Sequence, residues 1–146
     1  MAVRRSISEI INKAIEIPVK KDKVAWLQEN ENQPLKTILK LWYDETVEFL
    51  IPDTPPPWKK NEYEDEAKSL LYHEARRLKI FIKGGGYDNL NQIKRESLFI
   101  SLLEDVDNDD AEMLCKMITR KSPKGLSLKT VMTAFPDLIE IKEKVS

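Results

Sequence analysis

The sequence is poor in cysteine and histidine, the residue types that most often build metal and catalytic sites. Cys115 is the only cysteine in 146 residues, so no disulfide can form within the chain and a reducing compartment is expected. It lies on an apolar helical stripe, which favours a buried thiol, whereas His73, the only histidine, lies among charged residues. One histidine and one cysteine cannot complete a zinc site, and no nucleophile with a neighbouring base is evident. We predict no catalytic residue, no metal site and no cofactor.

Long apolar runs are also lacking. No stretch approaches the ~18 apolar residues of a membrane-spanning helix, and the first residues lack the apolar core of a signal peptide. Lysine and arginine number 24 against 25 aspartate and glutamate, which gives a net charge of −1. This balance excludes a protein that is basic over its whole surface but allows a local basic patch. We expect a cytoplasmic protein (in the host cytoplasm if a phage encodes it) with no membrane partner and no small-molecule substrate.

What the sequence does contain is helical periodicity almost throughout. Apolar residues recur at the i, i+3, i+4, i+7 spacing of one helix face, and no alternating segment is long enough to compete as a strand. Ser6 with Glu9 forms a capping box, and Pro34 suits a first helical turn. We predict an all-α fold, a single compact orthogonal bundle of about six or seven helices in one domain over residues 1–146. The expected helices cover about 7–17, 21–29, 34–50, 62–82, 90–105, 109–118 and 128–135.

Three short motifs are similar to ligand sites but differ from them in detail. The glycines at 84–86 lack the spacing of a phosphate-binding loop and are better explained as a helix stop. Residues 105–109 begin like a calcium loop, but Asp110 replaces the required glycine and Lys116 the final glutamate. Residues 52–55 match the P-x-x-P pattern of SH3 ligands, which is common by chance.

The clearest functional signal is an acid-free basic stretch from Cys115 to Ala134. Arg120 and Lys121 have a second explanation, because cations favour the end of a helix that begins with acidic residues. This explanation does not apply to Lys124 and Lys129, because they flank a turn and the start of the next helix. The cations of the stretch are Lys116, Arg120, Lys121, Lys124 and Lys129.

The turn inside this stretch predicts a phosphate site. Gly125 lets the backbone approach a ligand closely, and Ser127 is the expected N-cap of the following helix. Free amides at a helix start, together with nearby lysines, can bind phosphate. The predicted DNA-phosphate-binding residues are Arg120, Lys121, Lys124, Gly125, Ser127 and Lys129.

Two groups of segments also suggest a family. The first is KDKVAWL (21–27) with PLKTILKLWY (34–43), and the second is AEMLCKMITR (111–120), KGLSLKTV (124–131) and FPDLI (135–139). Their order and spacing resemble the N-terminal all-helical DNA-binding domain of ATP-dependent DNA ligases, especially the compact bacteriophage type, over about residues 8–139.

The resemblance implies an all-α domain that grips the duplex backbone across the minor groove without reading its sequence. The phosphate-contacting turn of the family maps onto Lys124, Gly125 and Ser127, with Lys129 on the next helix. Ligases continue into a catalytic domain with a Lys-x-Asp-Gly motif, and the nearest match here, residues 20–23, lacks the glycine. We therefore expect no enzymatic activity.

Two functions remain open at this point. The first is a non-catalytic, sequence-independent duplex-DNA-binding domain, an accessory protein of phage-type replication, repair or transcription. The alternative is an adaptor that binds a sliding clamp or polymerase and has lost DNA binding. The alternative is favoured by an acidic block that would repel DNA if it shared the basic face: Glu104, Asp105, Asp107, Asp109, Asp110 and Glu112.

Overall fold

Apolar stripes and local caps determine where most helices begin. The computed structural model describes residues 6–59 and 71–139, and in these the only strand-like pairing is one isolated antiparallel bridge between Phe49 and Ile82. The all-α prediction is therefore confirmed. The helices are α1 (Ile7–Glu16), α2 (Lys20–Glu29), α3 (Gln33–Tyr43), α4 (Leu71–Glu74), the 3-10 helix η1 (Ala75–Phe81), α5 (Gln92–Asp105), α6 (Asn108–Ile118) and α7 (Leu128–Ala134).

Side-chain caps fix four of these starts, and at α5 the Asn91 side chain accepts a hydrogen bond from the Ile93 amide at 2.9 Å. The Ser6 hydroxyl accepts a hydrogen bond from the Glu9 amide at 3.2 Å, and the Asn32 side chain accepts one from the Leu35 amide at 2.8 Å. Ser127 caps α7 in the same way, accepting from the Thr130 amide at 3.2 Å. Each cap satisfies an amide that has no partner within its helix.

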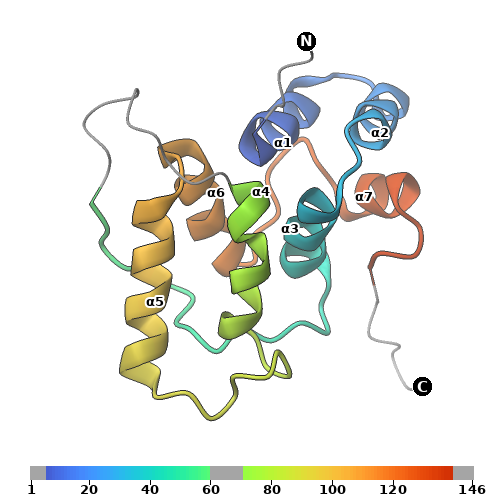
Figure 1. Cartoon of the computed structure of the whole chain (residues 1–146). Coiled ribbons are helices and arrows are strands. Elements are labelled where there is room, and N and C mark those ends of the chain that lie inside the picture. The colour runs from blue at the N-terminus through green and yellow to red at the C-terminus, as the bar shows by residue number, and fades with distance from the viewer. Residues whose placement is uncertain (1–5, 60–70, 140–146) are drawn as a thin grey trace, which may run out of the picture.

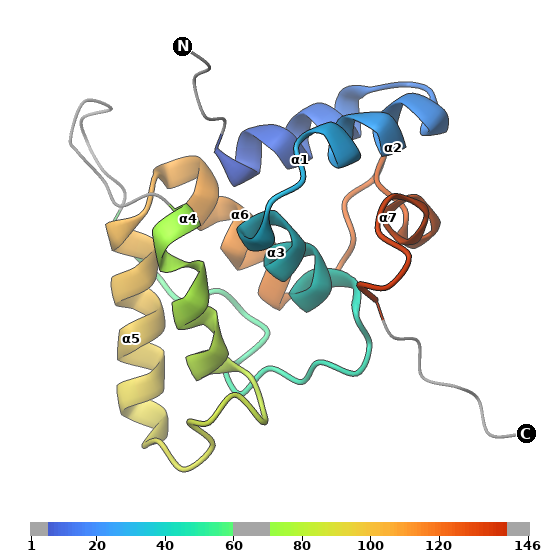
Figure 2. The same ribbon diagram turned by 45° about the vertical axis from the view of Figure 1, so that its right-hand side comes forward.

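Helix α3 lies at the centre of the arrangement. Figures 1 and 2 show α4, η1 and α5 on one side of it and α7 on the other, with α1 and α2 together across one end. Helix α2 packs on α7, and α6 packs on α5, α3 and α1. Leu35, Ile38 and Leu39 of α3 are fully buried in a core to which every α-helix contributes residues. None of the helices in the described residues combines the length and the apolar composition that a bilayer crossing demands.

One predicted helix is too long, and another is described only in part. The helix expected over 34–50 ends at Tyr43, because Asp44 adopts an extended backbone and its carboxylate accepts a hydrogen bond from the Thr46 amide at 2.8 Å. The helix expected over 62–82 is described only from residue 71, as the short α4 followed by the 3-10 helix η1. Residues 60–70 lie outside the described part.

A buried carboxylate joins the start of α1 to the start of α6. Asp110 is almost completely buried, and one of its oxygens accepts a hydrogen bond from the Ser8 amide at 3.0 Å. Burial raises the pKa of the Asp110 carboxyl, and the negative charges of Asp107 and Asp109 add to this, while the bonds from Ser8 oppose it. The folded protein therefore binds the Asp110 proton more tightly than the unfolded chain does.

The raised pKa makes a testable contribution to stability. The stabilisation from protonated Asp110 is complete below the ordinary carboxyl pKa of about 4 and is lost as the pH rises through the raised value. The variant Asp110→Asn keeps an acceptor for the Ser8 amide without the buried charge. We expect its free energy of unfolding to gain on that of the wild type as the pH rises, measured by urea denaturation across this range.

Asp22→Asn is the matched control, because Asp22 is an exposed carboxylate in the first turn of another helix, α2, and does not act on Asp110. Its difference from the wild type should stay small throughout. A constant difference between wild type and Asp110→Asn over the whole range would contradict the raised pKa.

Candidate nucleic-acid interface

Residues 119–127, which we call the basic loop, connect α6 to α7 and carry the centre of the acid-free stretch. The chain reverses at Arg120, whose φ of 62° lies in the left-handed region that non-glycine residues rarely adopt. Such a conformation persists only where surrounding contacts hold it. The contacts come from α2, α3 and the segment that follows α3.

Two consecutive aromatic residues of α3 hold the two ends of the basic loop. The Trp42 indole donates a hydrogen bond to the carbonyl of Lys121 at 2.9 Å, and the Tyr43 hydroxyl donates one to the carbonyl of Leu126 at 2.7 Å. Both rings are buried. Burial raises the pKa of the Tyr43 hydroxyl, so that it remains a protonated donor.

Lys23 of α2 adds a contact beside Leu126, near the α7 end of the basic loop. Its ammonium donates to the carbonyls of Ala14 and Ile15, at 3.0 Å each, and to the carbonyl of Gly125. Gly125 has a φ of 93°, and a β-carbon there would lie 2.8 Å from the Ile15 carbonyl oxygen. The glycine is thus required by close packing on the end of α1, a reason that involves no ligand.

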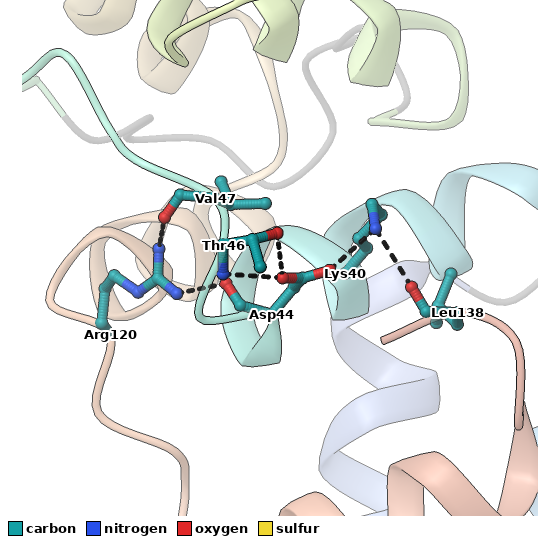
Figure 3. Close-up of polar contacts among 6 residues, drawn as sticks. All are labelled: Lys40, Asp44, Thr46, Val47, Arg120 and Leu138. Atoms are coloured by element: carbon teal, nitrogen blue, oxygen red, sulfur yellow. Dashed lines mark hydrogen bonds and ion pairs between the residues drawn. The ribbon is translucent and has the colours of Figure 1, made fainter. Parts of the chain in front are cut away.

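Arg120, one of the predicted phosphate-binding residues, points back toward α3. Its guanidinium donates to the carbonyls of Asp44 and Val47 (Figure 3). It also lies over the Phe49 ring, 5.6 Å from the centroid. Much of its hydrogen-bonding capacity is therefore used inside the protein. Arg120 positions the loop and is the least available of the predicted cations for a phosphate.

The same close-up shows why the end of α3 is a fixed point. The buried Asp44 carboxylate accepts hydrogen bonds from the Lys40 ammonium at 2.8 Å and from the Thr46 hydroxyl at 2.5 Å (Figure 3). Lys40 also donates to the carbonyl of Leu138 at 3.2 Å, beyond α7. The end of α3 thus holds both Arg120 of the basic loop and the segment that follows α7.

The remaining predicted cations face solvent. Lys121, Lys124 and Lys129 are exposed, whereas the carbonyls of Lys121, Gly125 and Leu126 accept from donors inside the molecule. The Ser127 hydroxyl, also predicted to bind phosphate, is engaged with Thr130 as the α7 cap. The loop therefore directs acceptors inward and lysine side chains outward, an arrangement suited to an anionic surface.

The acidic block does not share this surface. The exposed acids Asp107 and Asp109 lie at the start of α6 and Glu112 lies near its middle, whereas the basic loop follows its end. An α-helix of 11 residues is about 16 Å long at 1.5 Å per residue. Asp105 is paired with Arg77 at 3.2 Å.

The other residues singled out from the sequence lie elsewhere. Cys115 is buried as expected, and burial raises the pKa of its thiol, which disfavours the reactive thiolate. His73 lies in α4. The anchors Trp42, Tyr43 and Lys23 were missed as site residues. The signal that could have found Trp42 and Tyr43 is chemical, because a buried indole or phenol requires an acceptor.

Tyr43→Phe tests the anchoring. The change leaves the buried Leu126 carbonyl without its partner, so we expect the free energy of unfolding to fall by about 1–2 kcal/mol in urea denaturation. Tyr87→Phe removes a hydroxyl from an exposed ring and should change the stability little. Equal stability of the two variants would show that the hydrogen bond to Leu126 does not stabilise the fold.

Gly125→Ala tests the close approach to Ile15. The substitution places a β-carbon at positive φ and against the Ile15 carbonyl, and we expect a loss of about 2–3 kcal/mol in the same measurement. Gly84→Ala is the matched control, because Gly84 has a similar φ of 84° with open space around its β-carbon position. It should lose only about 1 kcal/mol. If both variants lose the same, the packing against Ile15 is unimportant.

Comparison with known proteins gives a family but no activity. Residues 10–124 match the sequence profile of DUF6433, a family of unknown function, so the chain belongs to this family. The matched region runs from α1 through α6 and ends within the basic loop. No curated protein gives a significant match.

Proposed function

We propose that this DUF6433 protein is a non-catalytic module that binds the phosphate backbone of duplex DNA, without reading its sequence, as an accessory protein of phage-type replication, repair or transcription. The contact surface is formed by the exposed lysines of the basic loop and of α7. Lysine contacts to phosphates supply affinity and orientation but carry no sequence information.

The observation that carries this proposal is the anchoring of an acid-free basic loop. Donors from Trp42, Tyr43 and Lys23 fix its backbone, so that Lys121 and Lys124 extend from a rigid support. A rigid loop loses less conformational entropy on binding than a mobile one does. The exposed lysines therefore keep more of their electrostatic attraction as net affinity.

The neighbouring corner between α1 and α2 adds a smaller contribution. Lys20 and Lys21 are exposed at the start of α2, the helix whose Lys23 contacts Gly125. Glu16 and Asp22 are exposed at the same corner and partly offset them. The resemblance to the DNA-binding domain of ligases also supports the proposal, since its phosphate-contacting turn corresponds to Lys124–Ser127.

A salt titration tests the proposal. Contact with about four phosphates predicts that log K falls with log salt with a slope near −4. Binding would be measured by fluorescence anisotropy on a labelled duplex, intact and with a single nick. Tighter binding to the nicked duplex would strengthen the link to ligases, and a flat salt response would contradict backbone binding.

A double charge reversal locates the surface. Lys124→Glu with Lys129→Glu removes two phosphate contacts, and we expect affinity near 0.15 M salt to fall at least about 30-fold and the slope to lose about two units. Arg76→Glu with Lys94→Glu is the matched control, because these exposed cations belong to η1 and α5, on the opposite side of the molecule from α7 (Figures 1 and 2). Equal losses in the two double variants would exclude the basic loop as the site.

An adaptor that binds a sliding clamp or polymerase is the second candidate. The net charge of −1 and the exposed acids at the start of α6 favour it, because they form a surface separate from the basic loop. Nuclease-resistant co-purification with such a protein, combined with no measurable DNA affinity, would support the adaptor over the DNA binder.

A further inference from the structure

The segment between α3 and residue 59 covers two adjoining hollows, which we call the groove. The first has a volume of about 590 Å³ and the second about 270 Å³. Ile51 and Ile118 line both, so the two hollows share a wall. The larger hollow borders the basic loop at Thr119 and Arg120, but none of the exposed lysines proposed to contact DNA lines the groove.

The smaller hollow is apolar. Pro52, Pro55 and Pro56 line it together with Phe99 of α5 and the shared Ile118 of α6. Its volume is below the range of about 300–1,000 Å³ typical of small-molecule sites, and it suits a single inserted side chain. Because proline fixes its own backbone angle, this wall is largely preformed. Preformed apolar pockets that take one large side chain are typical of the energetic centre of protein interfaces.

The groove is also acidic. Glu45, Glu48 and Asp53 line the larger hollow, and Glu96 lines the smaller one. Of the described residues that line the groove, Arg120 alone is cationic, and its guanidinium is bonded to the Asp44 and Val47 carbonyls.

Glu48 and Ile93 further define the charge and the extent of the groove. Glu48 has a partner in Lys83 at 3.7 Å, but both side chains are exposed, so the pair neutralises little. Ile93 extends the apolar surface beyond the hollows. It is 76% exposed, and it lies one helical turn before Glu96 on the same face of α5.

We propose that the groove is a docking site for a protein segment that carries one large apolar side chain flanked by lysine or arginine residues. The small hollow takes the apolar side chain, and the carboxylates attract the flanking cations. Complementary charge of this kind selects the partner and speeds its encounter. The same carboxylates repel a polyanion such as DNA, so the groove and the exposed lysines of the basic loop favour partners of opposite charge.

Short synthetic peptides test the docking site on the full chain. The probe has a central phenylalanine with lysines on both sides, and two matched peptides replace either the lysines by glutamate or the phenylalanine by alanine. Backbone amide shifts in NMR spectra should move at Ile51, Thr54 and Phe99 with the basic aromatic peptide. Its affinity should exceed that of each matched peptide at least about tenfold.

Variants of exposed residues locate the contact without disturbing the core. Glu45→Lys with Asp53→Lys should weaken binding at least about tenfold, and Ile93→Ser should weaken it severalfold. Glu16→Lys with Glu29→Lys, on α1 and α2, makes the same change in net charge and should leave binding unchanged.

Several results would overturn the proposal. They are equal losses in the two double variants, equal affinity for the alanine-centred peptide, shifts that map outside the groove, no binding of any peptide, and occupation of the groove by duplex DNA or by a second copy of the chain.

Discussion

Carbonyl oxygens at helix ends and in loops have no partner within their own element, and cationic side chains from other elements satisfy several of them in this protein. Lys23 serves the end of α1 and the basic loop, and Lys40 serves Leu138. Arg95, itself buried, donates to the carbonyls of Ile80, Tyr87 and Asp88 around the end of η1, and Arg120 serves the segment after α3. Without these bonds the connections between helices would lose their defined shape.

This use of charge changes how the composition is to be understood. Cations and acids are nearly equal in number, yet some cations act as internal donors and some acids, such as Asp44 and Asp110, as internal acceptors. The charged side chains that are not used in internal bonds determine the surface charge, which is positive on the basic loop and negative around the groove. A nearly neutral protein can therefore present two surfaces with opposite preferences.

Features that depend on local signals were predictable from the sequence. The caps at Ser6 and Ser127, the start of α3 and the spans of α5 and α6 follow from spacing and from short-range hydrogen bonds. The length of α3 was not predictable, because the Asp44 turn and the distant Arg120 override an apolar pattern that continues to Leu50. The candidate site was likewise predictable only in part. The exposed lysines could be identified from composition, but the anchors could not, since periodicity predicts that Trp42 and Tyr43 are buried without giving their acceptors.

The bonds that hold the basic loop join residues 79, 83 and 102 positions apart along the chain. Bringing such distant segments together costs chain entropy before the contacts repay it. The loop therefore acquires its shape only when α2 and α3 have packed against the segment between α6 and α7. If α2 or α3 detached by local unfolding, the same lysines would belong to a flexible segment without a fixed conformation. The basic surface is thus a property of the completed fold, and its presence reports that α2 and α3 are in place.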